Sequence, residues 1–123
     1  MVLEICVDSL ASARAAIAGG ADRLELCSAL LAGGLTPYEA LLRQIREKSD
    51  IPIRCLMRPR PGDFLYTPEE RELMRRQIMQ LKNAGANGFV IGCLTPPGKS
   101  GHRCHEAADG SLLRLRCHAA SVH

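Results

Sequence analysis

The chain has 123 residues, 46% hydrophobic and 24% charged, with a formal net charge of +3 and only 3% aromatic residues. That length suits one modest domain, and the composition gives no sign of the basic stripe or stacking aromatics of a nucleic-acid binder. No apolar run reaches membrane-spanning length, and the acidic start MVLEICVDSL is not a signal peptide. We therefore expect a cytoplasmic protein without a membrane partner, whose six cysteines stay reduced.

The first predicted unit is a strand followed by a helix. Residues 2–7 alternate in the manner of a half-buried strand, with Glu4 and Cys6 on the polar face. Residues 9–20, SLASARAAIAGG, are rich in alanine and end in two glycines. Ser9 suits the N-cap, so the pattern predicts a helix that stops at the glycines.

The second unit repeats this order. Residues 22–27, DRLELC, alternate again and place Glu25 and Cys27 on the polar face. Residues 33–49 open on two glycines, then offer Thr36 as an N-cap and a proline at the first helical position. The apolar stripe of this predicted helix consists of Leu41, Leu42 and Ile45.

The third unit and a fourth strand complete the regular part of the chain. Residues 51–60, IPIRCLMRPR, predict a strand, and a glycine- and proline-bearing loop follows. Residues 67–85 predict a strong helix with Thr67 as its cap. Its expected stripe consists of Leu73, Ile78 and Leu81. Residues 87–94, NGFVIGCL, predict the fourth strand.

The order β-α-β-α-β-α-β with short connections predicts a parallel sheet with helices packed outside. One face of three successive strands carries Glu4, Glu25, Arg54 and Arg58. Charged residues of both signs suit the interior of a barrel better than an open sheet that helices cover on both faces. Because a (β/α)8 barrel needs about 250 residues, we expect a partial TIM barrel of about four strands and three helices, followed by an irregular tail.

Five segments of the chain resemble the CutC copper homeostasis protein family. They are LEIC, GADRLELC, GGLTP, RPRPGDFLY and NGFVIGCL, in register over residues 2–95. The resemblance implies a cytoplasmic (β/α)8 barrel that forms homo-oligomers and is linked to copper tolerance, with no reaction firmly assigned. The family continues with further βα units and a TFHRAFD-like motif, which this sequence lacks.

The pattern changes after Pro96. Codons compatible with residues 98–111, read one nucleotide later, encode GKVDTDAMKRLMAA, which resembles what the family has after its fourth strand. We therefore divide the chain into residues 1–96, the N-terminal half of a CutC-like barrel, and residues 97–123, a tail hypothesised to be frameshifted. The tail groups His102, Cys104, His105, Cys117 and His118. Because this cluster lacks zinc-finger spacing, we do not expect it to be a selected metal site.

Glu4, Glu25 and Arg58 are the candidate catalytic residues. Buried carboxylates are costly unless they are paired, and Arg58 is the expected partner of the two acids. The alternative is a structural ion network that fills the barrel. Arg58 and Arg60 lie at the carboxyl end of the third strand, where barrel active sites lie, and suit an anionic small molecule. Salt bridges within the loop are the alternative for both, and Asp63 either contacts substrate or caps a turn.

Cys6 and Cys27 are the candidate metal ligands. They end neighbouring strands on the face of the two glutamates, and thiolates are soft ligands suited to Cu(I). Buried cysteine also serves as a small core residue, which is our expectation for Cys55 on the helix-facing side. Three functions remain open: a truncated copper homeostasis protein that binds Cu(I), a barrel enzyme acting on an anionic small molecule, and a non-functional fragment.

Overall fold

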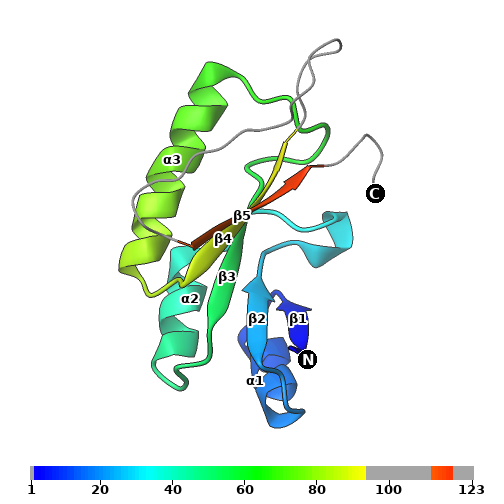
Figure 1. Cartoon of the computed structure of the whole chain (residues 1–123), viewed down its shortest axis with the longest axis vertical. Coiled ribbons are helices and arrows are strands. Elements are labelled where there is room, and N and C mark those ends of the chain that lie inside the picture. Colours follow the sequence, from blue (N-terminus) through cyan, green and yellow to red (C-terminus); the bar gives the residue numbers. More distant parts are fainter. Residues whose placement is uncertain (1, 94–111, 118–123) are drawn as a thin grey trace.

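The structure, a computed structural model, describes residues 2–93 and 112–117, with side chains for residues 2–91 (Figure 1). The strands form one parallel sheet in the order β1-β2-β3-β4-β5. Their bounds are β1 Glu4–Val7, β2 Arg23–Leu26, β3 Ile53–Met57, β4 Gly88–Cys93 and β5 Leu112–Cys117. The helices are α1 Leu10–Ala18, α2 Glu39–Arg46 and α3 Pro68–Asn83, with a 3-10 turn, η1, at Leu30–Ala32.

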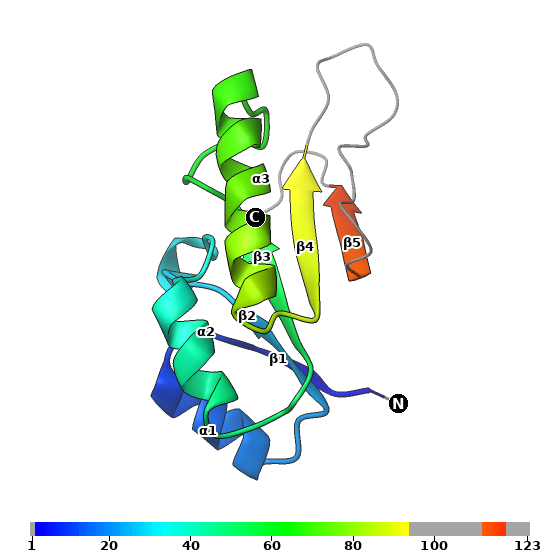
Figure 2. The same ribbon diagram turned by 90° about the vertical axis from the view of Figure 1, so that its left-hand side faces the viewer.

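The three α-helices lie together on one face of the sheet (Figures 1 and 2). Each strand pairs with the next one along the chain, and crossovers of one hand then place every helix on the same side. A doubly wound sheet would carry helices on both faces. The arrangement therefore confirms the predicted partial barrel of parallel strands with three helices.

The core lies between the sheet and these helices. Alternate residues along each strand share one face (one parity), and those that face the helices, such as Leu24, Ile53 and Phe89, are fully buried there against Leu42 and Leu81. Cys55 has the same parity and is 0% exposed, which confirms its predicted place in the core. The residues of the other parity, including Cys6, Glu25 and Arg54, therefore share the opposite face, which would be the interior of a closed barrel.

The structure confirms some of the predicted helix caps and contradicts others. Ser9 and Thr67 cap α1 and α3 in capping boxes, as expected. Thr36 was wrongly expected to cap α2: the helix begins after Tyr38, and the Thr36 hydroxyl instead accepts from the backbone N–H of Arg58 at 2.9 Å. The stripe of α3 is wrong at Leu73, which is 47% exposed, while Met74 is buried.

Residues 112–117 depart from the expected irregular tail. They form β5, parallel to β4, with Gly88 opposite Leu112 and Cys93 opposite Cys117. The letters LLRLRC alternate, a strand signal that the sequence analysis did not use. The rest of residues 97–123 lies outside the described residues, so the frameshift stays a prediction. The underlying DNA tests the frameshift hypothesis. If the hypothesis is right, deleting one base near Pro96-Pro97 must open a reading frame that encodes further βα units.

Candidate functional site

The carboxyl ends of β1, β2 and β3 bring the predicted site residues to one side of the sheet. In the parallel register Cys6 lies opposite Glu25, and Glu25 lies opposite Arg54. Cys27 follows two residues after Glu25 and therefore points to the same face. Arg58 follows directly after β3. The sheet thus gathers thiols, a carboxylate and guanidinium groups on the face opposite the three described α-helices (Figure 2).

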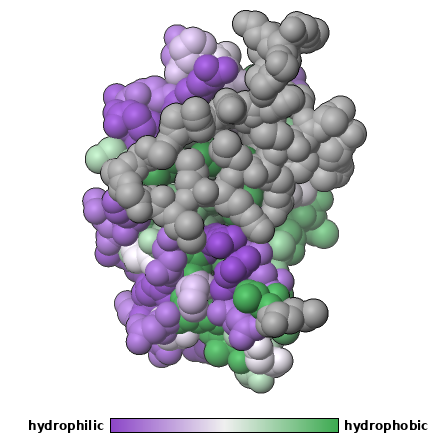
Figure 3. Space-filling view, in the orientation of Figure 1, coloured by the Kyte–Doolittle hydropathy of each residue, from purple (hydrophilic) through white to green (hydrophobic). Residues whose placement is uncertain are grey.

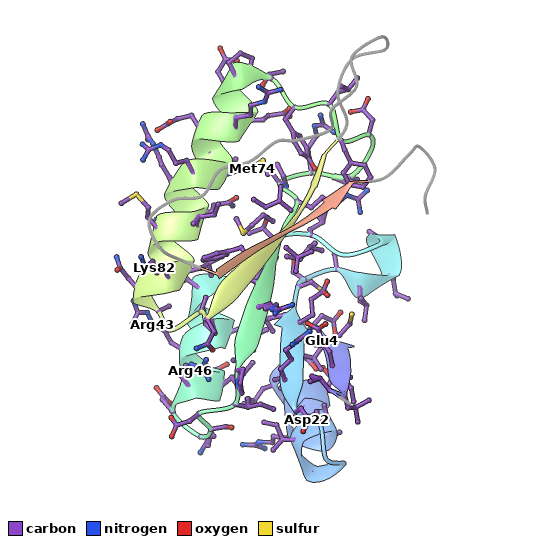
Figure 4. All side chains as sticks on the ribbon, in the orientation of Figure 1. Glu4, Asp22, Arg43, Arg46, Met74 and Lys82 are labelled. Atoms are coloured by element: carbon purple, nitrogen blue, oxygen red, sulfur yellow. The ribbon has the colours of Figure 1, made fainter. Side chains whose placement is uncertain are left out.

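Glu4 has a different ion partner from the one that the sequence predicts. The guanidinium Nε of Arg23, the residue opposite Glu4 in the register, lies 3.3 Å from its carboxylate. Both side chains are partly buried, and Glu4 lies on the side of the sheet away from α2 and α3 (Figure 4). Glu4 therefore takes part in an ion pair at the amino ends of β1 and β2, away from the carboxyl ends where barrel chemistry takes place.

Glu25 is the most enclosed acidic side chain of the site, with 5% exposure. Its register neighbour Arg54, rather than Arg58, is the arginine that the sheet places beside it. Burial of a carboxylate in this setting is consistent with opposite charge on the neighbouring strand. The register thus sets Cys6, Glu25 and Arg54 in a lateral row, and the expected link between Glu25 and Arg58 stays a prediction.

Among the described residues, the Arg58 guanidinium donates to backbone carbonyls rather than to a carboxylate. Its Nη1 donates to the carbonyls of Ala32 and Gly34, at 3.2 and 3.1 Å, and its Nη2 donates to Gly62 at 3.2 Å. The group also lies 5.2 Å from the ring centroid of Phe64. Arg58 thus ties the loop after β2 to the loop after β3.

Arg60 is engaged within its own loop. Its Nε and Nη2 donate to the Glu70 carboxylate at 2.7 and 3.1 Å, and its other donors reach three loop carbonyls and Asp63. Asp63 also accepts from the N–H of Leu65 at 3.2 Å, which caps a turn. The Arg60 guanidinium also lies over the ring of Tyr66. The Arg60 guanidinium is thus already engaged by groups of its own loop and by Glu70. Anion binding at Arg58, Arg60 and Asp63 stays a prediction.

The two thiols of the candidate metal pair differ in exposure. Cys6 is exposed, whereas Cys27 is 2% exposed and its Sγ lies 3.6 Å from the carbonyl of Val7. Burial, together with the nearby Cys6, Asp8 and Glu25, raises the pKa of Cys27 from 9.0 to about 12. The Cys27 thiol is therefore protonated at neutral pH, and a metal ion would have to displace its proton.

Sequence reasoning assigned no role to Asp8, although it lies on the same alternating face as Glu4 and Cys6. Its carboxylate accepts from the backbone N–H of Leu30 at 3.1 Å and contributes to the raised pKa of Cys27. Within the described ranges, no group of three or more His, Cys, Asp and Glu side chains is placed to hold a metal ion.

Comparisons with known proteins show the family of the chain. A family model described as the CutC family matches residues 1–109. The chain belongs to the CutC family. It is 52% identical over 97 residues to the copper homeostasis protein cutC homolog of Caenorhabditis elegans, covering 78% of this chain and 39% of that protein. It is 51% identical over 96 residues to a CutC family protein of Vibrio campbellii, with the same coverage.

A solved structure supports the same membership. The CutC crystal structure from Streptococcus agalactiae superposes with a TM-score of 0.68 at 29% identity, over 77% of this chain and 47% of that one. This chain therefore spans less than half the length of the CutC proteins it matches. The family match extends to residue 109, beyond the boundary predicted at Pro96-Pro97.

None of the helices in the described part of the chain is long and apolar enough to cross a membrane.

Proposed function

We propose that this chain serves copper homeostasis by binding Cu(I) between the thiolates of Cys6 and Cys27. The observation that carries the proposal is the placement of two cysteines on one face of adjacent parallel strands, with Cys27 two residues beyond the register partner of Cys6. Membership of a family whose relatives bear the name copper homeostasis protein supports copper as the metal. Thiolates are the ligands that Cu(I) prefers.

The strand spacing favours a metal bridge over a disulfide at this pair. A lateral step of one strand and an axial step of two residues place the two Cα atoms about 8 Å apart. A direct disulfide requires Cα atoms within about 7 Å. A bridging metal adds two metal–sulfur bonds of about 2.3 Å each and so spans the larger gap.

Competition with the chromophoric chelator bathocuproine disulfonate, under anaerobic reducing conditions, measures this function. Cys6→Ser combined with Cys27→Ser should weaken Cu(I) binding about a hundredfold, because hydroxyls replace both soft ligands. The matched control is Cys104→Ser combined with Cys117→Ser, which removes two thiols from the tail and should leave the affinity unchanged. Equal affinity of the first variant and the parent would refute the copper pair.

A further inference from the structure

We propose that the β2–α2 loop, residues 28–35, is a lid over the Cys27 thiol and that Arg58 is the latch that holds it shut. This inference deepens the proposed function, since it concerns access to one of the two proposed ligands. It rests on the packing of the loop against Cys27 and on the hydrogen bonds of Arg58, and its test uses no metal.

The β2–α2 loop is a closed, self-contained segment. Ser28 and Leu35 exchange both backbone hydrogen bonds at 2.8 Å, so the two ends of the loop meet. Between them the chain turns through η1, and Leu31 is fully exposed at its tip. The hydrophobic patch at the right of Figure 3 lies over this segment. In the proposal, the residues between Ser28 and Leu35 open while the base of the loop stays paired.

The underside of the loop rests on the thiol. Gly34 is buried, and a Cβ built on it would lie 3.7 Å from the Sγ of Cys27 and 2.9 Å from the Cδ2 of Leu56. The Gly34 backbone therefore packs next to the Cys27 thiol, and in the proposal it blocks access to that thiol. Cys6 has no such cover and is exposed. The loop thus accounts for the difference in exposure between the two thiols.

Two side chains from other elements hold the loop down. Arg58, after β3, donates to the carbonyls of Ala32 and Gly34, and Asp8, after β1, accepts from the N–H of Leu30. Ala29 has a φ of 48°, a left-handed conformation that persists in a non-glycine residue only where its surroundings enforce it. The closed position therefore depends on a few identifiable bonds, of which Arg58 supplies those nearest to Cys27.

Alkylation of the metal-free protein by N-ethylmaleimide, followed peptide by peptide with mass spectrometry, tests the lid. Arg58→Gln should raise the labelling rate of Cys27 at least about tenfold, since each lost hydrogen bond is worth about a factor of five. Cys55, fully buried on the other side of the sheet, should keep its rate. Arg43→Gln is the matched control, because Arg43 is exposed on α2 and pairs with Glu39, and it should change neither thiol.

A second variant checks the same lid without changing a charge. Gly34→Ala forces a methyl group against Leu56 at a φ of +94° and should also raise the labelling of Cys27. An unchanged Cys27 rate in both variants would overturn the proposal. A parallel rise of Cys27 and Cys55 would overturn it too, because global unfolding would then control access. If the lid responds as expected while Cu(I) binding ignores Cys6 and Cys27, the proposed function fails and the lid stands.

Discussion

Raising the pH from 9 to 12 should remove about 3 kcal/mol of folding stability through Cys55 alone. Burial in the core raises the pKa of this thiol from 9.0 to about 12, with the Arg46 guanidinium acting in the opposite direction. Below pH 9 the thiol is protonated in both the folded and the unfolded chain. Between pH 9 and 12 the unfolded chain releases this proton and the folded chain retains it, so stability falls as the pH rises.

Denaturant titrations at pH 8 and pH 11 measure this loss. Cys55→Ala removes the titrating group, so the difference in unfolding free energy between the two pH values should shrink by about 2 to 3 kcal/mol relative to the parent. The matched control is Cys6→Ala, a thiol removed from an exposed position. If the Cys55→Ala variant loses as much stability as the parent between pH 8 and pH 11, ionisation of Cys55 does not cause the loss at high pH.

Replacing Arg46 by methionine should lower the free energy of unfolding by about 3 kcal/mol at neutral pH. Arg46 ends α2, and its guanidinium donates to the carbonyls of Gly85 at 2.9 Å and Ile51 at 2.6 Å. It also donates to the side-chain oxygen of Asn87, which in turn accepts from the N–H of Ile53. One side chain therefore ties α2 to the entry of β3 and to the turn before β4 (Figure 4).

Packing makes this position intolerant of change. Gly85 has a φ of +115°, and a Cβ built on it would lie 2.9 Å from the Cγ of Arg46, so the turn is shaped around the arginine. Methionine keeps much of the apolar length and leaves the acceptor atoms without their donors. Arg43→Met, one turn earlier on the exposed face, should cost about 0.5 kcal/mol or less. Equal losses in the two variants, measured by urea unfolding, would contradict the assigned role of Arg46.

Local signals predicted most of the fold because the relevant interactions lie close in sequence. The capping boxes at Ser9 and Thr67 each involve a residue three positions away, and the period-2 alternation of the strands marks which face is buried. The charged residues of both signs on the strand face opposite the helices indicated a barrel rather than an open sheet. In contrast, Thr36 satisfies every local rule for an N-cap, but bonds to Arg58, 22 residues away, instead.

The role of the candidate site stays a prediction, and the ion partner expected for Glu4 was wrong. Pairing of Glu4 with Arg23, and the placement of Arg54 beside Glu25, depend on the register between strands, which no single strand encodes. The contact of the β2–α2 loop with Cys27 depends on glycines at positive φ and on an arginine from β3. Such contacts join three segments, so alternation within one of them could not reveal them.

Copper K-edge absorption of the protein loaded with one equivalent of Cu(I) tests the central claim most directly. The proposal predicts a Cu(I) ion with two sulfur neighbours, and loss of that sulfur shell when Cys6→Ser and Cys27→Ser are combined. A shell of nitrogen or oxygen neighbours in the parent protein, or an unchanged sulfur shell in the double variant, would contradict it.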